Sequence, residues 1–196
     1  AILEIVRRAS EQVNDKQLYL QVSDSLRKTN PEVAETVYQI ALRKHKQSKK
    51  VWIAGGEAKF LEGDSAGARE VLERAVLSLP RRKHIQTILK FAQMEYRYGS
   101  AERGRTGFES LVGNFVKRVD VWNVYIDMEV RKLKSSGESR DLQFLRNLFQ
   151  RCCSLRLSSK KMKHFFKRYL EFEREFGDEE SMEAVKQLAR DYVQSQ

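Results

Sequence analysis

The stretch Val51–Pro80, VWIAGGEAKFLEGDSAGAREVLERAVLSLP, contains two segments with helical periodicity, separated by a Gly-Asp turn and closed by a proline. In the second segment the small residues Ala68 and Ala75 would let two helix backbones approach each other. Leu72, which lies between them at helical spacing, would fill the groove that separates the helices. The stretch therefore predicts a helical hairpin.

The same pattern returns along the whole chain. Each first helix opens on a large residue, at Leu18, Trp52, Ile88, Trp122 and Phe166. A small or apolar residue follows on the second helix, at Ala34, Ala68, Gly104, Leu145 and Val185, and a mostly large one comes four residues later, at Tyr38, Leu72, Phe108, Phe149 and Ala189. A period of about 34 residues with such contacts is typical of stacked helical hairpins. We therefore predict an all-α fold, a right-handed α-solenoid of about five hairpins, of a kind that binds partners more often than it catalyses reactions.

The repeat pattern also predicts the domain organisation. We expect a single repeat domain over residues 1–196, with repeats at about 15–45, 50–80, 84–113, 119–157 and 160–193. Residues 1–12 resemble the second helix of another repeat, so we expect a truncated helix there and a chain cut from a longer protein. The inner faces of the first helices would form a groove for a partner helix or an extended peptide.

Two stretches depart from a regular hairpin. Gly55 and Gly56 inside a helix cost about 1–2 kcal/mol of helix propensity. Close approach of the partner helix would explain them, although they could also loosen that repeat. The insertion 134–138 lengthens the fourth hairpin, and we expect it to form a surface loop.

The composition is that of a helical protein with an excess of positive charge. The net charge is +10, which favours nucleic acid or acidic protein surfaces as partners. Both prolines, Pro31 and Pro80, fall at the edges of helical patterns, and no apolar run is long enough for a membrane span. The adjacent Cys152 and Cys153 lack the spacing of a zinc site, and we expect buried, reduced thiols.

The basic residues follow the repeat. They gather where a second helix connects to the next first helix, at Lys44, Lys46, Lys49 and Lys50, at Arg81, Arg82 and Lys83, at Lys117 and Arg118, and at Lys160, Lys161 and Lys163. Equivalent loops of a solenoid lie along one edge, so the sequence predicts a positive stripe that contacts RNA phosphate or an acidic protein segment. Part of this pattern has a simpler explanation, because cations near helix C-termini gain about 0.3–1 kcal/mol.

Other polar and aromatic residues suggest structural roles. Glutamates recur late in the first helices and arginines recur in the second, at Glu95, Glu129 and Glu173 and at Arg69, Arg105 and Arg146. We expect Arg–Glu bonds between the two helices of a hairpin. The aromatic residues Tyr96, Tyr98, Phe165 and Tyr169 have helical spacing and are expected to pack in the core, which argues against sequence-specific RNA recognition.

No constellation of residues indicates catalysis. The histidines His45, His84 and His164 lie in or beside basic stretches, without a serine or cysteine at motif spacing, and we expect solvated surface side chains. The chain has no glycine-rich nucleotide loop and no metal-ligand spacing. We therefore expect no catalytic residue, no cofactor and no metal.

The residues that fill the repeats resemble a known family. Trp52, Gly56, Ala68, Leu72, Ala75 and Pro80 resemble a tetratricopeptide repeat (TPR). The strings Trp122-x-x-Tyr125-x-x-Met128-Glu129 and Arg105-x-x-Phe108-Glu109 resemble its half-a-tetratricopeptide (HAT) variant, which is found in RNA-processing complexes. The resemblance assigns structural repeat positions to Trp52, Ala68, Leu72, Ala75, Phe108, Trp122, Tyr125, Glu129, Phe149 and Phe166.

Longer runs resemble one branch of this family, the C-terminal HAT module of large ribosome biogenesis factors that carry many S1 RNA-binding domains. The runs are 50–53, 75–80, 90–95, 102–105, 120–129 and 161–170. The resemblance implies a nucleolar protein-interaction scaffold in early pre-rRNA processing of the small-subunit precursor. Its partners would be pre-ribosomal assembly factors and pre-rRNA, the RNA bound mainly through S1 domains that this chain lacks. We expect a monomer that does not contact membranes; the alternative is a HAT scaffold of splicing or of mRNA 3′-end processing.

Overall fold

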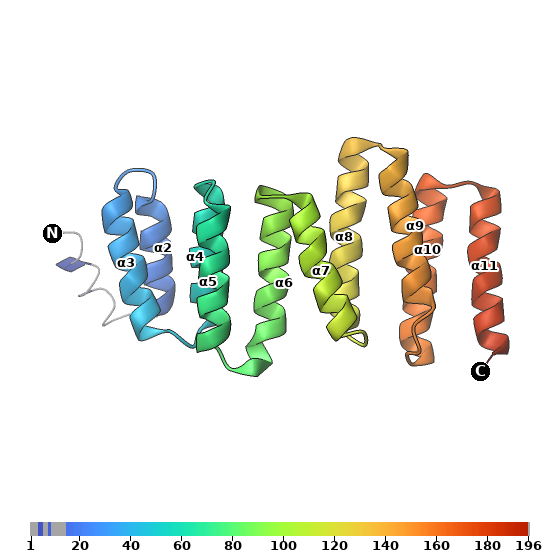
Figure 1. Cartoon of the computed structure of the whole chain (residues 1–196), viewed down its shortest axis with the longest axis horizontal. Coiled ribbons are helices and arrows are strands. Elements are labelled where there is room, and N and C mark those ends of the chain that lie inside the picture. Colours follow the sequence, from blue (N-terminus) through green and yellow to red (C-terminus); the bar gives the residue numbers. More distant parts are fainter. Residues whose placement is uncertain (1–3, 6–7, 9–14, 196) are drawn as a thin grey trace. The chain divides into compact units, whose positions relative to one another are not determined.

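The computed structural model describes residues 4–5, 8 and 15–195, and residues 15–195 form a series of α-helices joined by short turns (Figure 1). The helices are α2 (Asp15–Leu26), α3 (Pro31–Lys44), α4 (Lys49–Leu61), α5 (Ser65–Ser78), α6 (Arg81–Tyr98), α7 (Ala101–Asn114), α8 (Val119–Ser136), α9 (Ser139–Cys153), α10 (Ser159–Phe176) and α11 (Glu179–Gln194). The predicted all-α fold of consecutive hairpins is confirmed. The truncated helix expected over 1–12 falls mostly outside the described residues.

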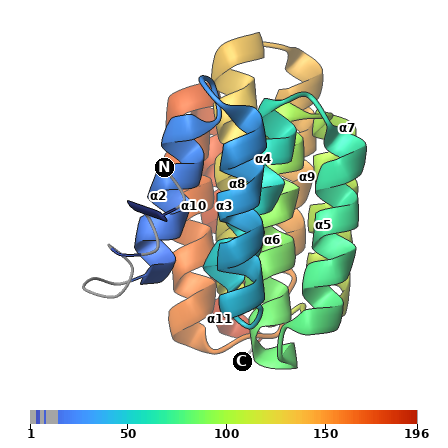
Figure 2. The same ribbon diagram turned by 90° about the vertical axis from the view of Figure 1, so that its left-hand side faces the viewer.

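The chain divides into two compact units, Ala1–Phe108 and Glu109–Gln196, with the boundary inside α7. In the first unit α2 packs on α3 and α4 packs on α5, while α4 also contacts α2, α3 and α6. In the second unit α8 packs on α9 and α10 packs on α11, and α9 contacts α10. Figure 2 shows the helices of each unit running alongside one another. A single repeat domain over 1–196 stays a prediction.

Polar caps and proline set several helix starts. Pro31 occupies the first turn of α3, where its missing N–H costs nothing, and the Asn30 side chain accepts a hydrogen bond from the N–H of Val33. Asp64 caps α5 in the same way, through the N–H of Gly67 at 2.8 Å. Each of these short polar segments therefore ends one helix and begins the next.

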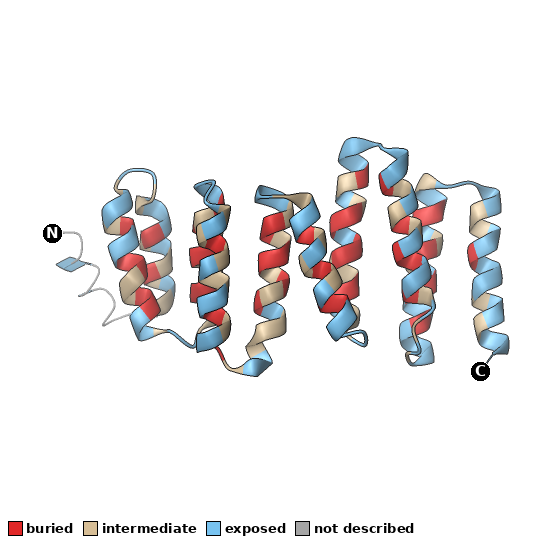
Figure 3. Cartoon of the chain, viewed as in Figure 1, coloured by how far each residue is buried: buried red, intermediate tan, exposed pale blue. Residues whose placement is uncertain are grey.

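Each helix from α2 to α11 has buried residues (Figure 3), and the repeat positions lie on α4, α5, α7, α8, α9 and α10. All of these positions are buried except Leu72, which is half-buried: Trp52, Ala68, Ala75, Phe108, Trp122, Tyr125, Glu129, Phe149 and Phe166. Phe149 stacks on Tyr169 with ring centroids 4.9 Å apart. Burying one such large side chain contributes about 1.5–3 kcal/mol, so these positions stabilise the contacts between helices.

The glycine pair in α4 allows two aromatic rings to contact the helix backbone. A Cβ atom on Gly55 would lie 1.9 Å from the hydroxyl of Tyr38 on α3, and one on Gly56 would lie 2.3 Å from ring carbons of Phe91 on α6. The expected close approach is present, but the neighbours are α3 and α6 rather than the hairpin partner α5. Because the rings fill the space of the missing side chains, the pair does not loosen the repeat.

Two of the recurring arginines bind a recurring glutamate of the next hairpin rather than of their own. Arg69 on α5 reaches Glu95 on α6 at 3.4 Å, and Arg146 on α9 binds Glu173 on α10 in a fork with N–O distances of 3.0 and 2.9 Å. The predicted location of the bonds was wrong, because the second helix packs between two first helices and turns its arginine toward the next one. The pairs therefore join consecutive hairpins.

The insertion in the fourth hairpin is helical. The expected surface loop 134–138 is wrong for residues 134–136, which extend α8 to Ser136. Leu133, which is 5% exposed, anchors this last turn, and its carbonyl accepts the N–H of Gly137 at 2.8 Å. Gly137 has a φ of 64°, a left-handed conformation that glycine adopts readily, and it ends the helix there.

The two cysteines are free thiols, Cys152 buried and Cys153 half-buried. Burial raises the pKa of Cys152 and raises the pKa of Cys153 to about 12. Because the thiolate is the reactive form, neither side chain is activated as a nucleophile near neutral pH.

Gly56→Ala should destabilise the fold. The added methyl would overlap the ring of Phe91, at a cost of about 1–3 kcal/mol that outweighs the gain of up to about 1 kcal/mol in helix propensity. Urea unfolding followed by circular dichroism measures the difference. Gly113→Ala is the control, because no atom lies within 4 Å of a Cβ added at this exposed position of α7. Equal stabilisation by both changes would contradict the packing described for α4.

Removing either partner of the Arg146–Glu173 pair should cost unequal amounts of stability. Arg146→Met leaves the Glu173 carboxylate, 1% exposed, without its cation, at an expected cost of about 3 kcal/mol. Glu173→Gln should cost about half as much, because the Arg146 side chain is 27% exposed and can reach water. Urea unfolding checks the order of these losses. Lys186→Met, which removes an exposed pair with Glu183, should cause no measurable loss of stability. If Arg146→Met caused as little loss as Lys186→Met, the buried Arg146–Glu173 pair would not stabilise the fold.

Candidate functional site

The candidate sites are two hollows of the first unit, each lined by charged side chains. Among them, no three His, Cys, Asp or Glu side chains are grouped so that they could hold a metal ion, and no helix has the length and apolarity of a membrane span. His164 is exposed, as expected, and contacts the side chain of Asn123 at 3.0 Å. His45 and His84 are half-buried, and His84 contacts the carbonyl of Leu79 at 2.7 Å. Both contacts are structural.

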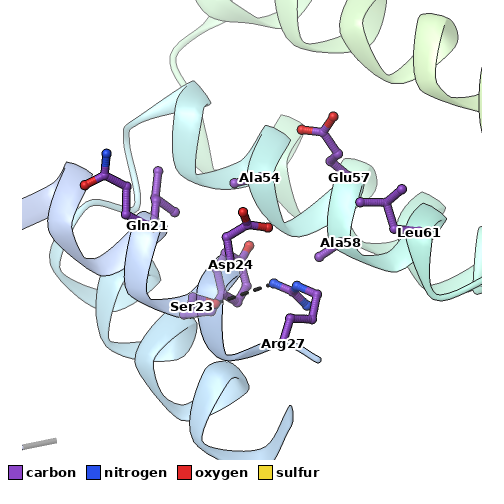
Figure 4. A pocket seen from close by; sticks show the side chains of 10 residues that line it. Gln21, Ser23, Asp24, Arg27, Ala54, Glu57, Ala58 and Leu61 are labelled. Atoms are coloured by element: carbon purple, nitrogen blue, oxygen red, sulfur yellow. Dashed lines mark hydrogen bonds between the residues drawn. The ribbon is translucent and has the colours of Figure 1, made fainter. Parts of the chain in front are cut away.

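A groove lies between the first helices α2 and α4 of the first unit (Figure 4). It is a cavity of about 460 Å³, whose α4 wall is formed by Ala54, Ala58 and Leu61. The two alanines leave room for a ligand side chain, and the exposed Leu61 offers an apolar contact. This hollow lies between two first helices, whereas a long groove along the inner faces of all the first helices stays a prediction.

Two of the polar side chains that line this groove are carboxylates. Asp24 on α2 and the half-buried Glu57 on α4 line it, and neither carboxylate has an ion-pair partner within residues 15–195. Arg27 is already engaged, because its guanidinium binds Glu62 at 2.9 Å and Ser23 at 3.5 Å. The groove thus combines an apolar wall with uncompensated negative charge, in a chain whose net charge is +10.

Tyr38 from α3 also lines the groove. Its hydroxyl is buried and makes no hydrogen bond with the residues that the structure describes. Burial raises the pKa of Tyr38 to about 12, so the side chain is a neutral hydroxyl at physiological pH. It supplies no charge to offset Asp24 or Glu57.

A second hollow lies at the turn between α3 and α4, which connects one hairpin to the next. We call it the basic pocket: a cavity of about 420 Å³ lined by Lys16, Lys44, His45, Lys46, Gln47, Ser48 and Lys83. Lys44, Lys46 and Lys83 belong to two of the basic clusters predicted from the sequence, and the fold brings these clusters together. Lys16, on α2, was not predicted.

Trp52 fixes the turn that carries the basic pocket. Its indole N–H donates to the carbonyl of Lys46 at 2.7 Å, and the guanidinium of Arg74 lies 5.8 Å from its ring centroid. In the second unit Trp122 repeats both contacts, with the carbonyl of Val116 at 2.8 Å and with Arg151 at 5.4 Å. The repeated tryptophan therefore connects the core to the basic turns.

Some of the remaining basic residues have a hydrogen-bond or ion-pair partner, and others have none among the described residues. Lys49 donates to the side chain of Gln86, and Arg118 forms two bonds with Asp120, at 2.8 and 2.6 Å, which lower the pKa of that carboxyl. The others are exposed, without a described partner: Lys50, Arg81, Arg82, Lys117, Lys160, Lys161 and Lys163. Only the first two clusters are seen to meet in one pocket.

The repeat register could have revealed Lys16. It precedes Leu18 by two residues, as Lys50 precedes Trp52, so the alignment places it at the same end of its first helix. The groove carboxylates gave no such signal, because Asp24 and Glu57 occupy different positions in their repeats.

Comparison with known proteins agrees with this architecture. The family model described as the PRP39 N-terminal HAT repeat matches residues 82–194, which is more than half of the chain. The rRNA biogenesis protein RRP5 of Arabidopsis thaliana is 37% identical over the whole chain, and the RRP5 homologue of Homo sapiens is 35% identical over the same length. The rrp5 protein of Schizosaccharomyces pombe is 40% identical over 83% of the chain.

The chain spans about a tenth of the length of these relatives, 10%, 10% and 9% respectively. The hairpins, the repeated tryptophans and the family match agree on one assignment. This chain belongs to the HAT-repeat family, as a HAT-repeat region homologous to the RRP5 rRNA biogenesis proteins.

Proposed function

We propose that this chain is a non-catalytic protein-interaction scaffold of a ribosome biogenesis factor. In this proposal it acts as a monomer in the nucleolus, in early processing of pre-rRNA within the small-subunit precursor. The printed names of its relatives concern rRNA biogenesis, which supports the context. These names favour it over the alternative of a HAT scaffold in splicing or mRNA 3′-end processing.

The groove between α2 and α4 is the observation that carries the proposal. Ala54 and Ala58 leave space for inserted side chains, Leu61 offers apolar surface, and Asp24 and Glu57 attract positive charge. Repeat arrays commonly receive a helix or an extended segment in such a groove. We therefore propose that the partner is a segment of a pre-ribosomal assembly factor that presents apolar side chains next to a lysine or an arginine.

The basic residues support an auxiliary contact with RNA. The exposed lysines and arginines at the turns match the charge of phosphate groups, whereas Tyr96, Phe165 and Tyr169 contribute to helix packing. The expected packing of Tyr98 was wrong, because its side chain is 39% exposed at the end of α6. Such a contact would depend on salt and not on base sequence. In this proposal the main contacts with pre-rRNA belong to S1 domains elsewhere in the full-length protein.

Disrupting the groove should remove a partner without unfolding the chain. The double change Glu57→Arg and Leu61→Asp replaces a carboxylate and an exposed apolar side chain, so at least one assembly factor should be recovered about tenfold less, as expected for a groove contact of 1–2 kcal/mol. Affinity purification of the full-length factor with quantitative mass spectrometry measures recovery.

The matched control is Glu70→Arg with Leu77→Asp, which makes the same changes on the exposed side of α5, where Leu77 is 88% exposed. This control should leave recovery unchanged, and thermal unfolding should show that both variants fold. If both variants recovered the same set of proteins as the unmodified factor, the groove would have no role in partner binding.

A further inference from the structure

We infer that the basic pocket at the α3–α4 turn binds the phosphodiester backbone of RNA, with the ammonium groups of Lys16 and Lys46 as the contacting charges. This inference rests on the auxiliary RNA contact proposed above, and it is independent of the protein-binding groove. It assigns that contact to one pocket and adds Lys16, from α2, to the residues that make it.

The charges in the pocket are poorly balanced. Four lysines and His45 line it, and no carboxylate does. The adjacent Asp15 is shared, because one oxygen lies 3.0 Å from His45 and the other 3.9 Å from Lys44. Lys44 also donates to the hydroxyl of Tyr19 at 3.0 Å. Lys16 and Lys46 have no partner among the described residues, so their charges are available to an anion.

The backbone of the turn is also arranged for an anion. Its carbonyl oxygens are occupied: that of His45 by the N–H of Ser48, that of Lys46 by the indole of Trp52, and that of Gln47 by the ammonium of Lys83 at 2.5 Å. Each of these oxygens thus has a lone pair engaged by a donor, which lowers its repulsion of a phosphate. The turn leads into α4, whose N-terminus receives no side-chain cap from Ser48, and a helix N-terminus favours negative charge.

The lining of the pocket favours RNA over an acidic protein segment. Every lining side chain is polar, whereas protein partners are usually anchored by apolar or aromatic contacts at the centre of the interface. The nearby rings of Tyr19 and Trp52 are 2% and 3% exposed, so bases cannot stack on them. Contacts from lysine, glutamine and serine to phosphate position an RNA without reading its sequence.

Filter binding of a single-stranded 12-nucleotide RNA to the chain, over a series of salt concentrations, tests the inference. Each phosphate contact contributes about 0.7 to the slope of log K against log salt. Lys16→Gln with Lys46→Gln should therefore reduce the slope by about 1.4 and weaken binding at least fivefold, equally for oligo(U) and oligo(A). Lys28→Gln with Lys90→Gln, the same charge change elsewhere in the first unit, should change neither.

Several outcomes would overturn the inference. If the two double variants weakened binding equally, RNA binding would depend on the overall charge of the chain and not on this pocket. If neither variant changed RNA binding, the auxiliary contact would lie elsewhere. No RNA binding at all would also remove the auxiliary contact proposed above. Oligoglutamate and inorganic phosphate are the competing probes: loss of oligoglutamate or phosphate binding in the Lys16/Lys46 variant, with RNA binding intact, would assign the pocket to that anion instead.

Discussion

Four small residues on α4 determine how the first unit packs and where it can bind. Successive helical residues point about 100° apart, so neighbours in sequence face different helices. Gly55 receives the ring of Tyr38 from α3, and Gly56 receives the ring of Phe91 from α6, because neither has a side chain to displace them. Ala54 and Ala58, one turn apart, lie on the remaining side and leave the hollow between α4 and α2 open. A single helix thus sets the distances to its neighbours and shapes the groove.

The two surfaces of the first unit have opposite chemistry. The groove joins apolar surface to two carboxylates, whereas the basic pocket has lysines and no apolar lining. The proposed protein segment and the proposed RNA strand would therefore bind different groups and would not compete. Trp52 connects the packed core to the basic pocket, since its ring is buried and its indole N–H holds the carbonyl of Lys46. This hydrogen bond therefore fixes the turn that carries Lys46 to the packed core of the α4–α5 hairpin.

Local patterns predicted the helices well because each hairpin is specified by residues close in sequence. The spacing of residues such as Trp52, Ala68 and Ala75, with caps and prolines at the turns, was enough to place most helices. Contacts between hairpins could not be predicted, since they depend on which way each helix face turns. For this reason Arg69 and Arg146 were assigned to the wrong helix pair. The sequence predicted a groove on the first helices, but it did not predict that Asp24 and Glu57 would line one. Lys16 was not predicted, although its position in the repeat matches that of Lys50.

Site-specific photo-cross-linking in purified pre-ribosomes would test the scaffold proposal most directly. A photo-reactive amino acid would replace Gln21, which lines the groove, in the full-length factor, and the same replacement at Leu77 would serve as the control on α5. The account predicts a defined protein adduct from position 21, with a peptide that carries apolar side chains and a lysine or an arginine, and none from position 77. Adducts from position 77 without any from position 21 would contradict it.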